Sequence, residues 1–264
     1  MESRRTPPGG PAPQGVALIA RDNLTERVYL ELRTGLLEGR FWPGHRFKVR
    51  QLAAAMGVSE TPVREALMQL ARERGIEMRA AHSMSVAELT VAQYLELRRI
   101  RILLEGLAAE EATLKIPDAA IDELAQVHAR LVEAEKDGHW RAAVRHNWHF
   151  HSSLFKYADM PELLAILENI WLRNGPLINY QYPHAPPTYA GVHQHLHLLE
   201  ALRKRQPEAV RLAIQADMIE GGTPLVALLE RLARGEITRE ELRASGGADE
   251  AYVSEPAEFE KRSL

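Results

Sequence analysis

The chain has 264 residues, 45% of them apolar, and 33 basic against 36 acidic side chains give a net charge of -3. It has no cysteine, which excludes disulfides and thiolate metal sites and fits a reducing, cytoplasmic compartment. No apolar run approaches the roughly 18 residues of a membrane helix, so we expect no membrane partner. Residues 1–80 hold 13 basic and 9 acidic side chains and residues 81–264 hold 20 and 27, which favours two parts with different partners.

Both ends of the chain predict little fixed structure. "MESRRTPPGGPAPQG" is rich in proline and glycine and has no apolar stretch after its arginines, so we expect a disordered arm over residues 1–20. "SGGADEAYVSEPAEFEKRSL" is polar and acidic, and we expect a flexible acidic tail over residues 235–264.

Residues 21–88 predict a winged helix-turn-helix domain. A helix begins near Leu24 and ends at Gly39, and a short second helix ends at Gly57. Thr61 or Ser59 caps a third helix over about 61–73. The alternating stretch "IEMRAAHSMSV" then predicts two short strands.

Long amphipathic helices punctuated by proline and glycine fill residues 89–234. This pattern predicts an all-α antiparallel bundle, so the whole protein is expected to be mainly α. The expected helices are 90–114, 118–136, 139–157, 161–178, 188–204 and 207–233.

The stretch "SETPVREALMQL" at the start of the third helix has the features of a recognition helix. Small hydroxyl residues allow close approach to DNA, and the helix N-terminus favours phosphate. Arg64, one turn in, can reach guanine or phosphate. The alternative is an ordinary capped helix on a globular surface.

Four polar residues of the second part face inward among apolar neighbours by helical phase: Asn147, His151, His195 and Asp217. An unpaired buried polar group costs about 1–3 kcal/mol, so the four need partners. One explanation is a hydrogen-bonded network with water. The other is a divalent metal (Zn, Ni, Mn or Fe) held by two imidazoles, a carboxylate and an amide oxygen. His193 and His197 fall on the solvent side of the predicted helix.

Arg101 is the remaining inward charge, and a buried guanidinium requires a planar anion. The anion is either Glu105, in an internal salt bridge, or the carboxylate of a bound effector.

The block "VYLELRTGLLEGRFWPGHRFKVRQLAAAMGVSETPVREALMQL" resembles the GntR family of bacterial transcription regulators. The resemblance implies DNA contacts at Arg50, Ser59, Thr61 and Arg64, with a wing contact near His82. Glu60 departs from the arginine of many members; its carboxylate either favours the helix dipole or accepts a hydrogen bond from a cytosine amino group.

The segments "RILLEGLAAEEA", "HNWHFHSSLFKYA" and "HQHLHLLEALR" resemble the FCD, or FadR-like, effector domain of that family. This resemblance implies a divalent metal at Asn147, His151, His195 and Asp217, where the last replaces the usual histidine. It also implies a small organic acid effector bound by Arg101, with Asn174 as a further candidate in the same pocket.

Together these features predict a ligand-responsive regulator, in most relatives a repressor, that binds palindromic operator DNA as a homodimer. A metal-dependent hydrolase using the His/Asp site is the alternative, but the chain has no HExxH motif. A helical scaffold that does not bind DNA is a third reading.

Overall fold

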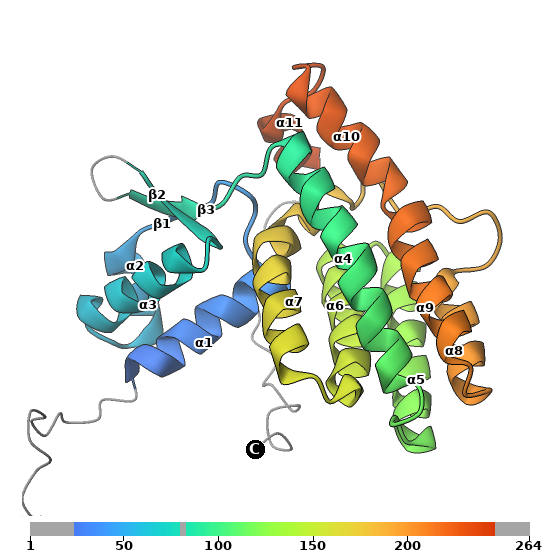
Figure 1. The fold of residues 1–264 in the computed structure, drawn as a ribbon. Coiled ribbons are helices and arrows are strands. Elements are labelled where there is room, and N and C mark those ends of the chain that lie inside the picture. The colour runs from blue at the N-terminus through green and yellow to red at the C-terminus, as the bar shows by residue number, and fades with distance from the viewer. Residues whose placement is uncertain (1–23, 80–82, 246–264) are drawn as a thin grey trace, which may run out of the picture.

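A computed structural model describes residues 24–79 and 83–245 (Figure 1). The N-terminal head consists of α1 (Leu24–Leu37), β1 (Arg46–Phe47), α2 (Val49–Met56), α3 (Glu60–Arg72), β2 (Ile76–Arg79) and β3 (Ser83–Val86). The three antiparallel strands have the order β1-β3-β2. This is the predicted winged helix-turn-helix, with β1 as a third strand too short for any sequence period. The predicted arm and His82 lie outside the described residues.

The helical domain begins with α4 (Val91–Ala112), α5 (Asp118–Lys136), α6 (Trp140–Phe155) and the 3₁₀ turn η2 (Lys156–Ala158). It continues with α7 (Pro161–Asn174), the 3₁₀ turn η3 (Gly175–Tyr180), α8 (Gln194–Arg203) and α9 (Pro207–Ala216). A π-helical turn η4 (Asp217–Gly221), α10 (Thr223–Ala233) and α11 (Arg239–Ser245) complete it. These helices stack side by side as a bundle, which confirms the predicted mainly α fold (Figure 1).

Three helices differ from their predicted extents. The helix expected over 161–178 ends at Asn174 and tightens into η3. The helix expected over 188–204 begins only at Gln194, because the prolines at 183, 186 and 187 keep the preceding residues in a loop. The helix expected over 207–233 is interrupted by η4, whose wider turn ends at the Gly221-Gly222 pair.

The head packs on the bundle through one continuous apolar cluster. Leu36 of α1 and Leu172 of α7 are both fully buried in it. Gly75 and Gly175 allow this close approach: a Cβ on Gly75 would lie 2.8 Å from the Leu172 side chain, and one on Gly175 would lie 2.6 Å from the Leu36 carbonyl oxygen. α1 is therefore in direct contact with α7 and η3 of the bundle.

Residues 239–245, assigned by the sequence analysis to a flexible tail, form α11. Leu242 is fully buried against α10 and η3. Arg243 donates to the Pro43 carbonyl of the head at 2.5 Å, and Arg239 lies 3.5 Å from Glu88. This short helix thus ties the head to the bundle. Residues 246–264 of the predicted tail lie outside the described part.

The segment Pro207–Ala233 is long and apolar enough to cross a membrane by length and composition. Inspection of apolar runs alone predicted no such segment. In the fold it comprises α9, η4 and α10, and Val210, Ile214 and Leu228 are buried in the domain's apolar clusters.

Candidate functional site

The residues predicted to contact DNA share one exposed region of the head. Arg50 lies on α2, and Ser59, Glu60, Thr61 and Arg64 lie at the start of α3; all five are exposed. Ser59 takes the cap position with an extended backbone (φ -75°, ψ 166°), and its side chain makes no cap hydrogen bond. The hydroxyls of Ser59 and Thr61 therefore stand at the helix N-terminus, where a DNA backbone could accept from them.

Glu60 pairs with Arg64 on this surface. Arg64 Nη2 lies 2.9 Å from Glu60 Oε2, one helical turn apart, and both side chains are about half exposed. An exposed pair of this kind contributes little to stability. It does engage one terminal nitrogen of Arg64, the arginine predicted to contact a base or phosphate.

Three side chains of types that bind metals, two histidines and one aspartate, converge inside the bundle. His151 comes from α6, His195 from α8, and Asp217 is the first residue of η4. His151 Nε2 lies 3.3 Å from His195 Nε2 and 3.5 Å from Asp217 Oδ2, and His195 Nε2 lies 3.8 Å from the same carboxylate oxygen. A π-helical turn changes the phase of the helix at the point where Asp217 turns inward, and such turns recur at functional sites.

These atoms fit a divalent metal. Zinc–nitrogen bonds of about 2.0–2.1 Å place neighbouring ligands about 2.9–3.4 Å apart, depending on the angle. The separation of 3.3 Å lies within this range, and those of 3.5 and 3.8 Å require only a small adjustment of the side chains. Asp217 Oδ1 accepts from Tyr189 at 2.8 Å, which leaves Oδ2 facing the imidazoles.

Burial and charge set the ionisation of the cluster. Burial alone would lower the pKa of His151, but Asp217 and Glu105 outweigh it and raise the pKa to about 9. Burial would raise the pKa of Asp217, yet the charge of the histidines around it, first His195 and then His151, holds this pKa well below its usual value. Burial lowers the pKa of His195 well below 6.5. A cation at this position is therefore electrostatically favoured.

Glu105 supports the cluster from behind. It is fully buried on α4, and its Oε1 accepts from Arg101 Nε at 2.7 Å and from Trp171 Nε1 at 2.8 Å. Its Oε2 and His151 Nδ1 are 3.5 Å apart, and neither atom has a hydrogen-bond partner. A carboxylate behind a histidine is the usual outer support of a metal ligand, since it orients the ring and increases its basicity.

Arg101 faces two ways. Its Nε is used by Glu105, the salt bridge that the sequence analysis considered, and its guanidinium lies 4.1 Å from the centre of the Trp171 ring. Its terminal nitrogens have no hydrogen-bond partner among residues 24–79 and 83–245, and the side chain lines a cavity. In this one conformation Arg101 can therefore both form the salt bridge to Glu105 and bind the carboxylate of an effector.

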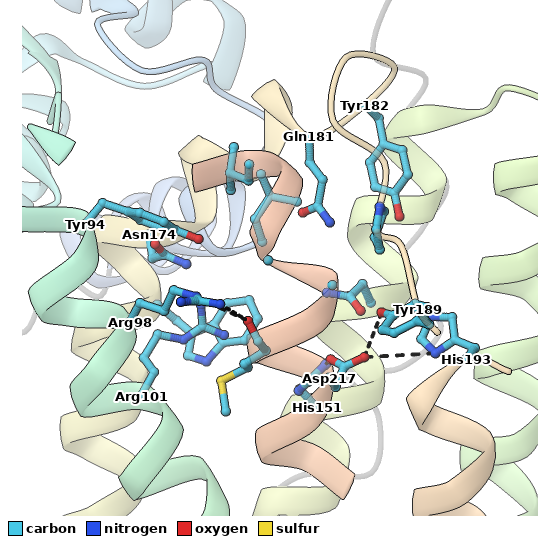
Figure 2. A pocket seen from close by; sticks show the side chains of 18 residues that line it. Tyr94, Arg98, Arg101, His151, Asn174, Gln181, Tyr182, Tyr189, His193 and Asp217 are labelled. Carbon is cyan, nitrogen blue, oxygen red and sulfur yellow. Dashed lines mark hydrogen bonds and ion pairs between the residues drawn. The ribbon is translucent and has the colours of Figure 1, made fainter. Parts of the chain in front are cut away.

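The cavity lies between the histidine cluster and α4 (Figure 2). His151, Asp217, His193 and Tyr189 line one part of it, and Figure 2 shows Arg98, Arg101, Asn174 and Tyr94 gathered in another. Its volume is about 60 Å³. Since one water needs about 10–15 Å³ on this measure, the space holds about four to six water-sized groups, which suits a small ligand.

The two amides predicted for this site also line the cavity. Asn147 lies one turn before His151 on α6 and is half-buried. Asn174 ends α7, is 2% exposed, and its Oδ1 has no hydrogen-bond partner. An unpaired buried amide oxygen is costly, so Asn174 requires a ligand or water in the cavity.

Sequence reasoning missed several residues of the site. His193 was placed on the solvent side, but the helix begins after it, and its side chain is 14% exposed and lines the cavity. Tyr189 belongs to a loop for which the sequence has no periodicity. Glu105 was considered only as a partner of Arg101. For Glu105 the only available signal was its spacing: four residues after Arg101, on the same inward face.

A DNA-binding head, fused to a helical domain with a buried polar cavity, defines a ligand-responsive transcription regulator. Residues 24–86 match the profile of "Bacterial regulatory proteins, gntR family" and residues 96–219 match the FCD domain. The chain belongs to the GntR family and carries an FCD effector domain.

Known relatives agree with this assignment. The HTH-type transcriptional regulator McbR of Escherichia coli is 30% identical over 199 residues, which cover 75% of this chain and 90% of McbR. The HTH-type transcriptional repressor RspR of the same organism is 25% identical over 201 residues, covering 75% and 86%. The structure of E. coli McbR/YncC superposes with a TM-score of 0.70 at 27% identity, covering 81% of this chain and all of that one. These are regulators rather than enzymes, so the hydrolase alternative is set aside.

Proposed function

We propose that this regulator is a cytoplasmic repressor which releases a palindromic operator when a small organic acid binds its FCD domain. The observation that carries the proposal is the cavity itself, where a metal-ligand cluster and an arginine with unpaired terminal nitrogens face the same space. A carboxylate can bind a metal ion and an arginine fork together.

The metal would be held by His151, His195 and Asp217, with Asn147 as a fourth ligand. A bound divalent ion would act as a Lewis acid toward carboxylate oxygens of the effector and would fix their orientation. Arg101 would donate to the same acid, and Asn174 would hydrogen-bond a polar group of it. A cavity of about 60 Å³ favours a short-chain acid over a long one.

The homodimer is supported by an exposed apolar stripe on α4, which lies across the front of the bundle (Figure 1). Ile100, Leu103, Leu107 and Leu114 are spaced three, four and seven residues apart, and their exposed fractions are 38, 67, 38 and 69%. Contiguous exposed apolar surface of this kind marks association. A dimer places two recognition helices on two half-sites, which requires a palindromic operator.

Regulation by an effector requires two conformations of the protein. An effector shifts the protein between two conformations only by its different affinity for each. Helix α7 connects the cavity to the head. Its residues Trp171 and Asn174 line the cavity, and Leu172 of the same helix packs against α1, so a shift of α7 on effector binding would also move α1. The relative RspR is named a transcriptional repressor, which supports repression as the sign proposed for this protein.

The test is operator binding by the full-length protein, measured by fluorescence anisotropy with a panel of short mono-, di- and hydroxycarboxylic acids. Each acid is tested on metal-loaded protein and on protein treated with a chelator. The proposal predicts that at least one acid lowers operator affinity and that chelation abolishes this response. An acid response of unchanged size after complete metal removal would contradict it.

A further inference from the structure

His195 is held on three sides. Its Nδ1 lies 3.3 Å from Nδ1 of His128, a buried residue of α5, while its Nε2 faces His151 Nε2 at 3.3 Å. One face of the ring stacks on Phe150, with 3.8 Å between ring centres and 10° between the planes. In this orientation each ring nitrogen of His195 faces a nitrogen of another histidine, so the position of the ring proton decides which nitrogen can accept.

The contact with His128 decides where that proton lies. A neutral imidazole has one N–H donor and one lone pair, and two Nδ1 atoms at 3.3 Å require one donor and one acceptor. If His195 donates, its Nε2 carries the lone pair and can bind a metal. If His128 donates instead, His195 Nε2 carries the hydrogen and cannot be a ligand.

His128, His193 and His195 also lie close enough to resemble a second metal set, since their ring nitrogens are within 4.8 Å of one another. His193 Nδ1, however, already accepts from the backbone N–H of His195 at the start of α8. His195 has one lone pair as a neutral ring, and it faces His151 and Asp217. A single metal site with His128 outside it is consistent with the Nδ1 contacts of His128 and His193 and with the Nε2 lone pair of His195.

We infer that His128 is a positioning residue: it accepts the Nδ1–H of His195 and thereby keeps His195 Nε2 free to bind the metal. The inference rests on the proposed metal site. It explains why a histidine is buried next to the cluster without reaching Asp217 or His151. An outer partner of a metal-bound histidine typically changes metal affinity 10- to 100-fold.

Two substitutions test this role. His128→Leu removes the acceptor, whereas His128→Asn keeps an oxygen close to the position of Nδ1. Full-length protein is titrated with Zn²⁺ in competition with a chromophoric chelator. We expect His128→Leu to weaken binding about 10- to 100-fold and His128→Asn to restore most of it. His197→Ala, an exposed histidine on α8, is the control and should not change the affinity.

The second readout is the ¹⁵N NMR spectrum of histidine-labelled, metal-free protein. In the wild type, His195 should be protonated at Nδ1, and in His128→Leu a Nε2–H form should appear. Wild-type Zn²⁺ affinity in His128→Leu, or equal losses in the Leu and Asn variants, would overturn the inference. If the wild type binds no metal, the proposed function fails, while the NMR tautomer still tests the contact with His128.

Discussion

Arg101 and Glu105 form a buried ion pair one helical turn apart on α4, with 2.7 Å between Nε and Oε1. The pair joins the two halves of the cavity, since Glu105 stands behind His151 and Arg101 faces the space beside Asn174. The Glu105 carboxylate therefore links Arg101 to the histidine cluster directly, so an anion bound by Arg101 would alter the electrostatic environment of His151.

Removing one partner of this pair should be more costly than removing both. Arg101→Ala removes the guanidinium that pairs with the buried Glu105 carboxylate, and breaking such a pair should lower the free energy of unfolding by about 3–5 kcal/mol. The double variant Arg101→Ala with Glu105→Gln should lose less, because no buried charge is left unpaired. Urea denaturation of the four proteins of this cycle measures the difference. A double variant less stable than Arg101→Ala would contradict the assignment.

Arg64→Ala should cost about 1–3 kcal/mol in operator binding, because it removes a contact to base or phosphate.

Glu60→Gln should have the opposite effect on DNA affinity. It frees Arg64 and removes a negative charge facing the DNA, so affinity should rise for operator and unrelated duplex alike. Anisotropy titrations over a range of salt concentrations separate the two effects. Glu123→Gln, an exposed acidic residue of α5, is the charge-matched control. If Glu60→Gln binds no better than this control, the pair does not restrain Arg64.

Gly221→Ala should disturb the metal cluster without touching a ligand. The added Cβ would lie 2.7 Å from the Tyr189 hydroxyl, which donates to Asp217. Displacing Tyr189 removes that hydrogen bond, and overpacking of this kind costs about 1–3 kcal/mol. We expect weaker metal binding and a lower melting temperature. The control is Gly191→Ala, in the loop that carries Tyr189, where the added Cβ would have no atom within 4 Å.

The same substitution in a Tyr189→Phe background isolates the cause. Without the hydroxyl, the nearest atom to the new Cβ is gone, so Gly221→Ala should cost less there than in the wild type. An equal cost in both backgrounds would show that the strain does not come from the Tyr189 hydroxyl, and would contradict this explanation.

Leu242→Ala tests whether α11 is a docked part of the fold. The side chain is fully buried, and such a truncation typically costs 2–5 kcal/mol. Glu240→Ala, on the exposed side of the same short helix, should change stability by less than about 0.5 kcal/mol. Equal stabilities of the two variants in chemical denaturation would mean that α11 does not hold the head to the bundle.

Sequence periodicity predicted most of this fold because the apolar stripes of the long helices are strong, local signals. It placed His151, His195, Asp217 and Arg101 inward, and all four are buried. It failed where structure depends on tertiary contacts. The loop before α8 carries Tyr189 and His193 into the cavity, and a π-helical turn that starts at Asp217 interrupts the helix expected over 207–233. Neither has a period that a single sequence displays.

Elemental analysis of purified protein tests the central claim most directly. Wild-type protein, expressed with added divalent metals and then dialysed, should retain about one metal ion per chain, because three buried ligand atoms converge within 3.8 Å. The variant carrying both His151→Ala and His195→Ala should retain none while keeping its helical circular dichroism. A wild type without metal, or a folded double variant that still holds one ion per chain, would contradict the account.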